Sequence, residues 1–211
     1  MDNRYVNCSI SKLDGFSNGT FVEYDFSGGD FKDACFLNSI FRGCLFQGGV
    51  PGNLIFFSSN FFNCTFKNFD FRRVIIGAEG GLFKDCQFLR CNFSGQQLES
   101  PHFDGCLFDH CKIKGVSFND SSFLGCRFVG RLEDTTFNGL YHKRSTGFQI
   151  LDRVDFSQAV FGDFVTFEDC DLSTCTPPAG NTFEDLLYAI YKNNPKILST
   201  GSSDRIVLET D

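Results

Sequence analysis

The stretch FKDCQFLRCNFSGQQLESPHFDGCLF, residues 83–108, carries an apolar side chain at every fifth position. Those positions are Phe83, Phe88, Phe93, Leu98, Phe103 and Phe108. A period of five matches neither the 3.6 residues per turn of an α-helix nor the alternation of one long strand. It matches a short extended segment followed by a corner, and its repetition predicts a solenoid.

The five-residue step extends in both directions from this stretch. It runs from Phe16 to Ile76 with one weak unit at Pro51, and a second run continues from Phe83 to Phe128. A third, less regular part includes Phe137, Leu151, Phe156, Phe161, Phe167 and Leu172. Together these parts give about 28 units, enough to occupy most of the chain as one domain.

Two further positions of each unit support a coil whose short straight sides are joined by corners. In the 22 units of the two regular runs, the residue two places after the apolar position is Gly, Asn or Asp 15 times. These residue types accept a positive φ or close a tight turn. The residue two places before is often small, as at Ser39, Cys64 and Cys106. One large and one small inward side chain per unit would fill a narrow interior.

The cysteines give an independent estimate of the coil length. If four units make a 20-residue coil, and residues 77–82 add two residues as a bulge, five cysteines stack on one face. They are Cys44, Cys64, Cys86, Cys106 and Cys126, and the large residues of the same face are Phe26, Phe46, Phe66, Phe88, Phe108 and Phe128. We therefore predict an all-β fold over residues 1–177, a right-handed quadrilateral parallel β-helix. About seven coils at a strand spacing of about 4.8 Å would make a rod about 34 Å long.

Three interruptions are expected to leave the rod as loops, at 77–82, 129–136 and 138–150. Loops on a rigid scaffold are common binding sites, although an insertion without a function is the alternative for each. The candidate partner-binding residues are Tyr141, His142, Lys143 and Arg144 in the longest loop, with Arg131, Glu133 and Asp134 in the one before it.

The period ends before residues 178–211, where a helix is expected over about 182–193. Asn181 or Thr182 can cap its start, and Asn194-Pro195 stops it. Its apolar face consists of Phe183, Leu186, Leu187, Ile190 and Tyr191. We expect this face to cap the open end of the solenoid, and pairing with a second copy as a homodimer is the alternative. The tail at Arg205–Leu208 is expected either to form a strand or to stay mobile.

Composition narrows the function classes. The chain has 29 Phe, 11 Cys and no Trp in 211 residues, and its formal net charge is −7. The negative charge disfavours direct nucleic-acid binding. No apolar stretch reaches about 20 residues and no signal peptide is evident, so we expect a cytoplasmic protein with reduced thiols and no membrane contact. No Cys-x-x-Cys pair occurs and only three histidines are present, so we expect no metal, no cofactor and no catalysis.

The units resemble the pentapeptide-repeat family over about residues 8–177. Examples are Cys64-Thr-Phe66-Lys-Asn68, Cys106-Leu-Phe108-Asp-His110 and Ser121-Ser-Phe123-Leu-Gly125. Members that look similar include the quinolone-resistance (Qnr) proteins, their mycobacterial counterpart, and immunity proteins against gyrase-poisoning peptides. The resemblance implies an acidic rod, usually dimeric through a C-terminal helix, that engages DNA gyrase or topoisomerase IV in place of duplex DNA.

Two functions are therefore expected. The first is a non-enzymatic DNA mimic that binds a topoisomerase and protects it from quinolones or a gyrase-targeting toxin. The second is a scaffold or effector module that binds another protein through a solenoid face or the loop at Tyr141–Arg144. We favour the first. A rod-length of duplex DNA carries about 20 negative charges, so a chain of net charge −7 must concentrate its acidic residues on one face to mimic that charge.

Overall fold

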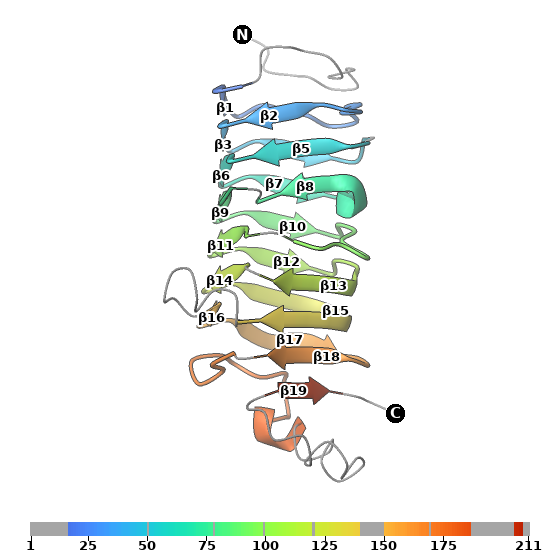
Figure 1. Cartoon of the computed structure of the whole chain (residues 1–211), viewed down its shortest axis with the longest axis vertical. Helices are drawn as coiled ribbons and strands as arrows, with labels where there is room; N and C mark the ends of the chain where they lie inside the picture. The colour runs from blue at the N-terminus through green and yellow to red at the C-terminus, as the bar shows by residue number, and fades with distance from the viewer. Residues whose placement is uncertain are drawn as a thin grey trace.

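The chain folds as a four-sided parallel β-solenoid, as the five-residue step predicts (Figure 1). The computed structural model describes residues 17–49, 51–77, 79–98, 100–119, 121–139, 150–168, 170–186 and, for the backbone, 205–208. From β2 to β18, strands at the front of Figure 1 point left, strands at the back point right, and the chain descends from the N-terminus, so the coil is right-handed. We number the sides face one to face four in chain order, and face one carries Phe36.

The strands are short on every face, because each unit contributes only about three extended residues. Face one holds β2 (Cys35–Leu37), β5 (Leu54–Phe57), β8 (Val74–Ile76), the end of β13 (Ile113–Asn119), the end of β15 (Arg127–Asn138), β18 (Val165–Glu168) and β19 (Arg205–Leu208). Face two holds β1 (Thr20–Val22), β3 (Ile40–Arg42), β6 (Asn60–Phe62), β9 (Leu82–Lys84), β11 (His102–Asp104), β14 (Ser122–Leu124) and β16 (Leu151–Asp152). Its seven strands form one parallel sheet, so the chain makes six complete turns between Phe21 and Leu151.

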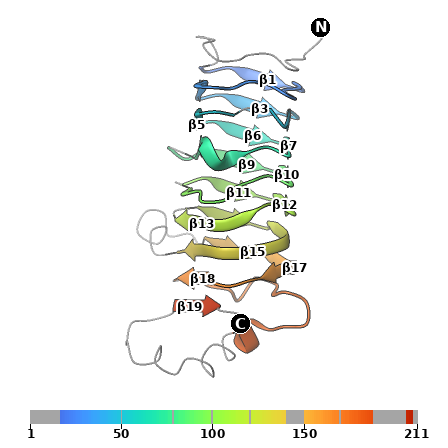
Figure 2. The ribbon, with the colours of Figure 1, turned by 90° about the vertical axis from the view of Figure 1, so that its right-hand side faces the viewer.

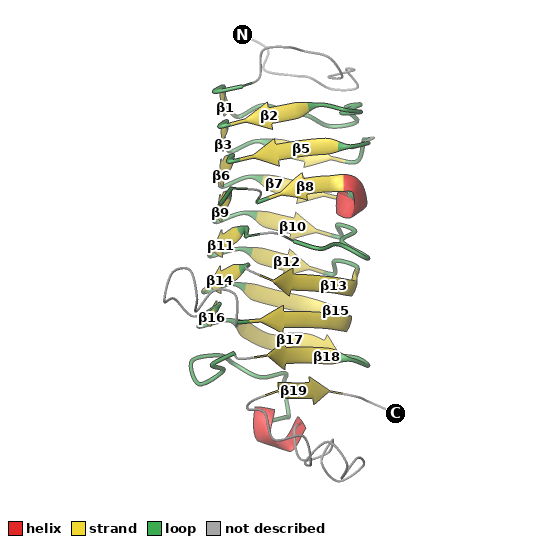
Figure 3. Cartoon of the chain, viewed as in Figure 1, coloured by secondary structure: helices red, strands yellow, loops and turns green. Residues whose placement is uncertain are grey.

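The other two faces close the square. Face three holds β4 (Leu45–Gln47), β7 (Thr65–Lys67), β10 (Gln87–Leu89), β12 (Leu107–Asp109), the start of β15 and the start of β17 (Asp155–Phe161). Face four has the 3₁₀ turn η1 (Phe71–Arg73) and isolated bridges that link Asp70 to Asn92 and Asn92 to Lys112. Later it is formed by strands that bend around the corners (Figure 2). Within the described ranges, the remaining helical residues are 183–186 (Figure 3), and no helix could span a membrane.

Corner geometry follows from the residues two places after each inward Phe. Several of them have a positive φ without being glycine, including Asn63 (52°), Arg90 (54°) and His110 (49°). A positive φ is uncommon outside glycine. Here it turns the chain at a corner, from one side of the square to the next. The amides of Asn63, Arg90 and His110 donate to carbonyls of the next coil.

Stacked phenylalanine rings fill the interior. On face three the rings of Phe26, Phe46, Phe66, Phe88, Phe108, Phe128 and Phe156 form one continuous column with centroid separations of 4.7–5.3 Å. Face two has a parallel column that starts at Phe21. Rings of neighbouring columns meet edge to face, as Phe61 and Phe66 do at 5.6 Å. Close-packed aromatic burial of this kind is the main stabilising contribution in the rod.

The five stacked cysteines of face three also lie inside, and their stack continues across the insertion at 77–82. Face three pairs Phe46 with Phe66 and then Phe66 with Phe88, so the coil there is longer by two residues and its register is kept. Cys44, Cys64, Cys86, Cys106 and Cys126 are all buried. The Sγ atom of Cys106 lies 3.2 Å from the carbonyl oxygen of Phe83 in the coil before.

One unit departs from the pattern of large and small inward residues. Pro51 occupies the large position of its unit on face four, and the next unit of that face carries Phe69 at the small position. The Phe69 side chain is 1% exposed, and its ring contacts those of Phe31, Phe46, Phe66 and Phe71 at 5.1–6.1 Å. The second ring of one coil therefore fills the space that the missing ring leaves in the coil before.

The prediction of a loop at 129–136 is wrong. These residues belong to β15, and Leu132, 1% exposed, fills the face-four position four residues after Phe128 and five before Phe137. One step of four residues replaces a step of five, and a search for steps of five reads such a segment as an insertion. At the first interruption the Gly80 amide donates a hydrogen bond to the Gly77 carbonyl, as in a turn, and Leu82, the last residue of the expected loop, already begins β9. In the third interruption, Asn138 ends β15, Ile150 is buried, and residues 140–149 lie outside the described part.

At the C-terminal end, a capped turn of helix and an added strand cover the last coil. The Thr182 hydroxyl oxygen accepts from the Asp185 amide at 2.9 Å, and the Asp185 carboxylate accepts from the Thr182 amide at 3.2 Å. This is a reciprocal capping box. β19 pairs antiparallel with β18, so the tail forms a strand on the exposed edge of the final coil.

We expect Thr182→Ala to loosen this helical turn without unfolding the rod. Loss of the capping hydroxyl costs about 1 kcal/mol, which raises the equilibrium constant for opening of the turn about fivefold. The measurement is amide hydrogen exchange at Leu186, whose amide donates to the Thr182 carbonyl at 3.1 Å. Exchange at Phe88, in the middle of the rod, is the internal control and should not change.

Candidate interaction surfaces

Along the described coils, buried apolar side chains fill the interior of the solenoid. The eleven core residues identified from the repeat, six phenylalanines and five cysteines of face three, are all at most 1% exposed. Burial raises the pKa of the Cys126 thiol well above its ordinary value, and it does the same for Cys111 on face four. Thiols of this kind stay neutral and unreactive. Across the described ranges, no three His, Cys, Asp or Glu side chains converge as a metal site would require.

The candidate loop residues fall into two groups. Tyr141, His142, Lys143 and Arg144 lie outside the described residues. Arg131, Glu133 and Asp134 lie on strand β15 of face four instead of on a loop. The Glu133 carboxylate accepts hydrogen bonds from Lys114 Nζ at 2.5 Å and from Arg131 Nε at 3.3 Å. Both bonds lower the pKa of the Glu133 carboxyl, and the bond from Lys114 has the larger effect. The structure thus brings Arg131 and Glu133 together in a small ion-pair network.

The C-terminal candidates are only partly described. The Phe183 ring lies 6.5 Å from Phe156 and 6.3 Å from Phe167, and both rings belong to the last coil. Leu186 also packs against the core. These two side chains therefore pack at the C-terminal end of the described solenoid. Leu187, Ile190 and Tyr191 lie outside the described residues.

Acidic residues do not gather on one face of the described rod. Face four carries six acidic and six basic side chains, and the charged side chains of faces two and three are also mixed in sign. Ion pairs join several of them, such as Lys84 with Asp104 at 2.6 Å and Arg127 with Asp155 at 3.0 Å. The condition for mimicry of DNA charge is therefore not met within the described residues.

Face one is different, because three successive described units in its N-terminal half carry no charged side chain. Units 34–38, 54–58 and 74–77 contain no Asp, Glu, Lys or Arg. Their outward side chains include Cys35, Leu37, Ile55, Phe57 and Ile75, and Ile75 is 50% exposed. Strands β2, β5 and β8 thus present a flat apolar strip at the front of Figure 1.

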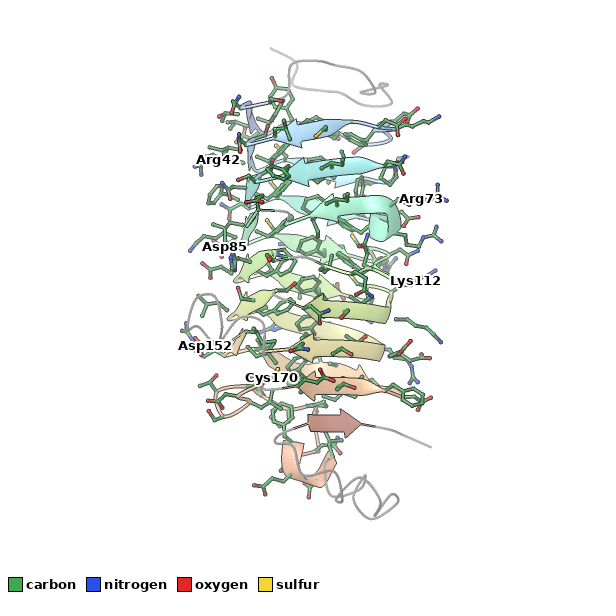
Figure 4. The ribbon with its side chains drawn as sticks, in the orientation of Figure 1. Arg42, Arg73, Asp85, Lys112, Asp152 and Cys170 are labelled. Atoms are coloured by element: carbon green, nitrogen blue, oxygen red, sulfur yellow. The ribbon has the colours of Figure 1, made fainter. Side chains whose placement is uncertain are left out.

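A basic surface, which sequence reasoning missed, covers face four and its corner with face three. It consists of three stacked segments, 65–73, 87–95 and 107–115, which hold six Lys or Arg residues and two Asp residues. The basic residues are Lys67, Arg72, Arg73, Arg90, Lys112 and Lys114. In Figure 4, Arg73 and Lys112 project from one edge of the rod, whereas Asp85 lies at the opposite edge. Grouping the outward residues by coil register would have revealed this surface from the sequence.

Two shallow cavities accompany the basic surface. The first, about 370 Å³, is lined by Asn53, Ile55, Arg72, Arg73, Val74, Ile75 and Gln96. The second, about 330 Å³, is lined by Ser94, His110, Cys111, Lys112, Ile113, Lys114, Arg131 and Glu133. Each has aliphatic side chains among its lining and guanidinium or ammonium groups beside them.

No family model matches the chain, and no curated protein sequence matches it. Among solved structures the chain is similar to full-length QnrB1, described as a plasmid-mediated fluoroquinolone resistance protein, at 15% identity and a TM-score of 0.37, over 92% of this chain and 93% of that one. It is also similar to HetL, a pentapeptide repeat protein involved in heterocyst differentiation regulation from the cyanobacterium Nostoc sp. strain PCC 7120. That match has 8% identity and a TM-score of 0.36, over 84% of this chain and 90% of that one.

Proposed function

We propose that the chain is a non-enzymatic rod that binds a protein partner through its outward surfaces. The observation that carries this proposal is the filled interior: stacked Phe rings and buried small side chains occupy it along the described coils. Chemical groups able to interact therefore lie outside, on flat ladders repeated at about 4.8 Å. Extended regular surfaces of this kind are what repeat proteins use for binding.

The partner we propose to test first is DNA gyrase or topoisomerase IV, in the cytoplasm. The resemblance of the repeat units to Qnr proteins supports this choice. Because the described faces carry mixed charges, the mimicry we propose is of the shape and length of a duplex segment. Seven strands on face two correspond to about 29 Å between the first and the last.

The test is a supercoiling assay with purified gyrase, ciprofloxacin and the full-length chain. We expect the chain to restore supercoiling in the presence of the drug, in proportion to its concentration. A matched variant replaces residues 140–149 with one glycine, which returns the step between Phe137 and Leu151 to five residues. Loss of protection with an unchanged melting temperature would assign protection to that loop, and no protection by the intact chain would refute the topoisomerase proposal.

A scaffold for a different protein is the second candidate, and the basic surface favours it, because a mimic of DNA has no use for a cluster of cations. For the C-terminal helix we propose the cap as its role, supported by the packing of Phe183 against Phe156 and Phe167. Sedimentation equilibrium would report a homodimer if the apolar side chains of residues 187–191 pair two copies.

A further inference from the structure

We propose that the basic surface is a docking site for an acidic polypeptide segment that also carries apolar side chains. This inference rests on the proposal that the chain binds protein, but it does not depend on a topoisomerase being the partner. It assigns a surface and a partner chemistry to a region that the repeat itself does not mark.

Four of the six basic side chains are not neutralised. Arg72 pairs with Asp70 at 2.7 Å, and Lys114 pairs with Glu133 at 2.5 Å. Within the described part of the chain, Lys67, Arg73, Arg90 and Lys112 are exposed and form no ion pair. Of the two aspartates, Asp70 binds Arg72 and is also close enough to Lys112 for that cation to help lower its pKa. Asp109 contacts the His110 ring and offsets one of the four unpaired cations. The surface therefore presents uncompensated positive charge on a chain whose net charge is −7.

Stacking of the coils holds these cations close together. Bridges between Asp70 and Asn92 and between Asn92 and Lys112 put the segments of Arg73, Arg90 and Lys112 on three consecutive coils. Two coil spacings amount to about 10 Å, which is about one Debye length at 0.1 M salt. A carboxylate placed over face four thus interacts with several cations at once.

The cavities decide in favour of a polypeptide over a nucleic acid. Ile55, half-buried, and Ile75, 50% exposed, line one cavity, and Ile113, a largely buried residue, lines the other, so apolar side chains find aliphatic contacts next to the cations. A phosphodiester backbone has nothing to place there. Long-range repulsion from the acidic remainder of the chain also opposes duplex DNA, which carries about six charges over 10 Å. A short segment meets only the local field.

The separation of the cavities indicates the length of the segment. Their linings centre on coils two spacings apart, at about 10 Å. In a polyproline II conformation, side chains three residues apart lie on one side of the chain about 9 Å apart. Two apolar side chains at that interval, with acidic residues between and around them, therefore fit both cavities while carboxylates reach Arg73 and Lys112.

The test uses the full-length chain and a fluorescein-labelled peptide, Glu-Glu-Leu-Glu-Glu-Leu-Glu-Glu, in an anisotropy titration at 50 mM and 300 mM NaCl. We expect saturable binding that weakens at the higher salt. The variant Arg73→Glu with Lys112→Glu should bind at least about tenfold more weakly, because two attractive charges become repulsive. Peptides with Gln for Glu, or with Ser for Leu, should bind more weakly than the parent.

The matched control is Arg42→Glu with Arg153→Glu, which changes the net charge equally but on face two. Arg42 lies over the Phe62 ring and Arg153 beside Asp152. Equal weakening by both double variants would reduce the binding to overall charge and overturn the proposal, as would an absence of saturable binding. Tighter binding of a 16-base-pair DNA duplex would overturn the choice of partner. Peptide binding together with no effect on gyrase would support this proposal and refute the topoisomerase proposal.

Discussion

Gly77→Ala is expected to destabilise the solenoid by about 2–5 kcal/mol. Gly77 has a φ of +80°, which a residue with a side chain adopts only with strain, and its backbone lies against the next coil. A Cβ atom there would lie 2.4 Å from the Pro101 nitrogen and 2.6 Å from its Cα. Because the obstruction is backbone, two coils must separate locally. Urea unfolding followed by far-UV circular dichroism measures the loss.

Gly80→Ala separates the two causes of that destabilisation. Gly80 has nearly the same φ, +82°, but a Cβ atom added there would have no neighbouring atom within 4 Å among the described residues. This variant should therefore lose only the cost of the left-handed backbone, about 1–2 kcal/mol. Equal losses for the two variants would show that the approach of Gly77 to Pro101 contributes nothing.

Phe69→Ala is expected to lower the free energy of unfolding by about 3–5 kcal/mol, which on a chain of this size is a fall of the order of 10 °C in the melting temperature. The ring fills the space beneath Pro51 and contacts four other phenylalanine rings. Its removal leaves a cavity that the rigid coils on either side cannot close. Thermal unfolding followed by circular dichroism provides the measurement.

Phe57→Ala is the matched control for this prediction. Phe57 lies on the outer side of face one and is 38% exposed, so the same substitution removes a ring that is already partly in water. We expect a loss below about 1 kcal/mol. If Phe69→Ala were equally mild, the filling role of Phe69 would be wrong, and the interior near Pro51 would have to collapse without it.

The points where sequence and structure diverge have physical causes that can be named. Leu132 was missed because a step of four residues places it out of phase, although its side chain fills the same position as the phenylalanines. Phe69 was passed over because it stands where a small residue is expected. The basic surface escaped notice because its members lie up to 47 residues apart in the chain and meet only when the coils stack.

By itself, the sequence determined the architecture of this protein. A ring every fifth residue, a turn-forming residue two places later and a cysteine every 20 residues are each local requirements of a narrow four-sided coil, so they are visible without coordinates. The coil register also indicates from the sequence which outward residues stack, but the tertiary structure alone decided which of them pair and which stay unpaired. Ion pairing and cavity shape depend on side-chain distances within and between coils. These distances pair Arg72 with Asp70 and Lys114 with Glu133, leave Arg73 and Lys112 without an ion pair among the described residues, and place the Phe183 ring against the last coil.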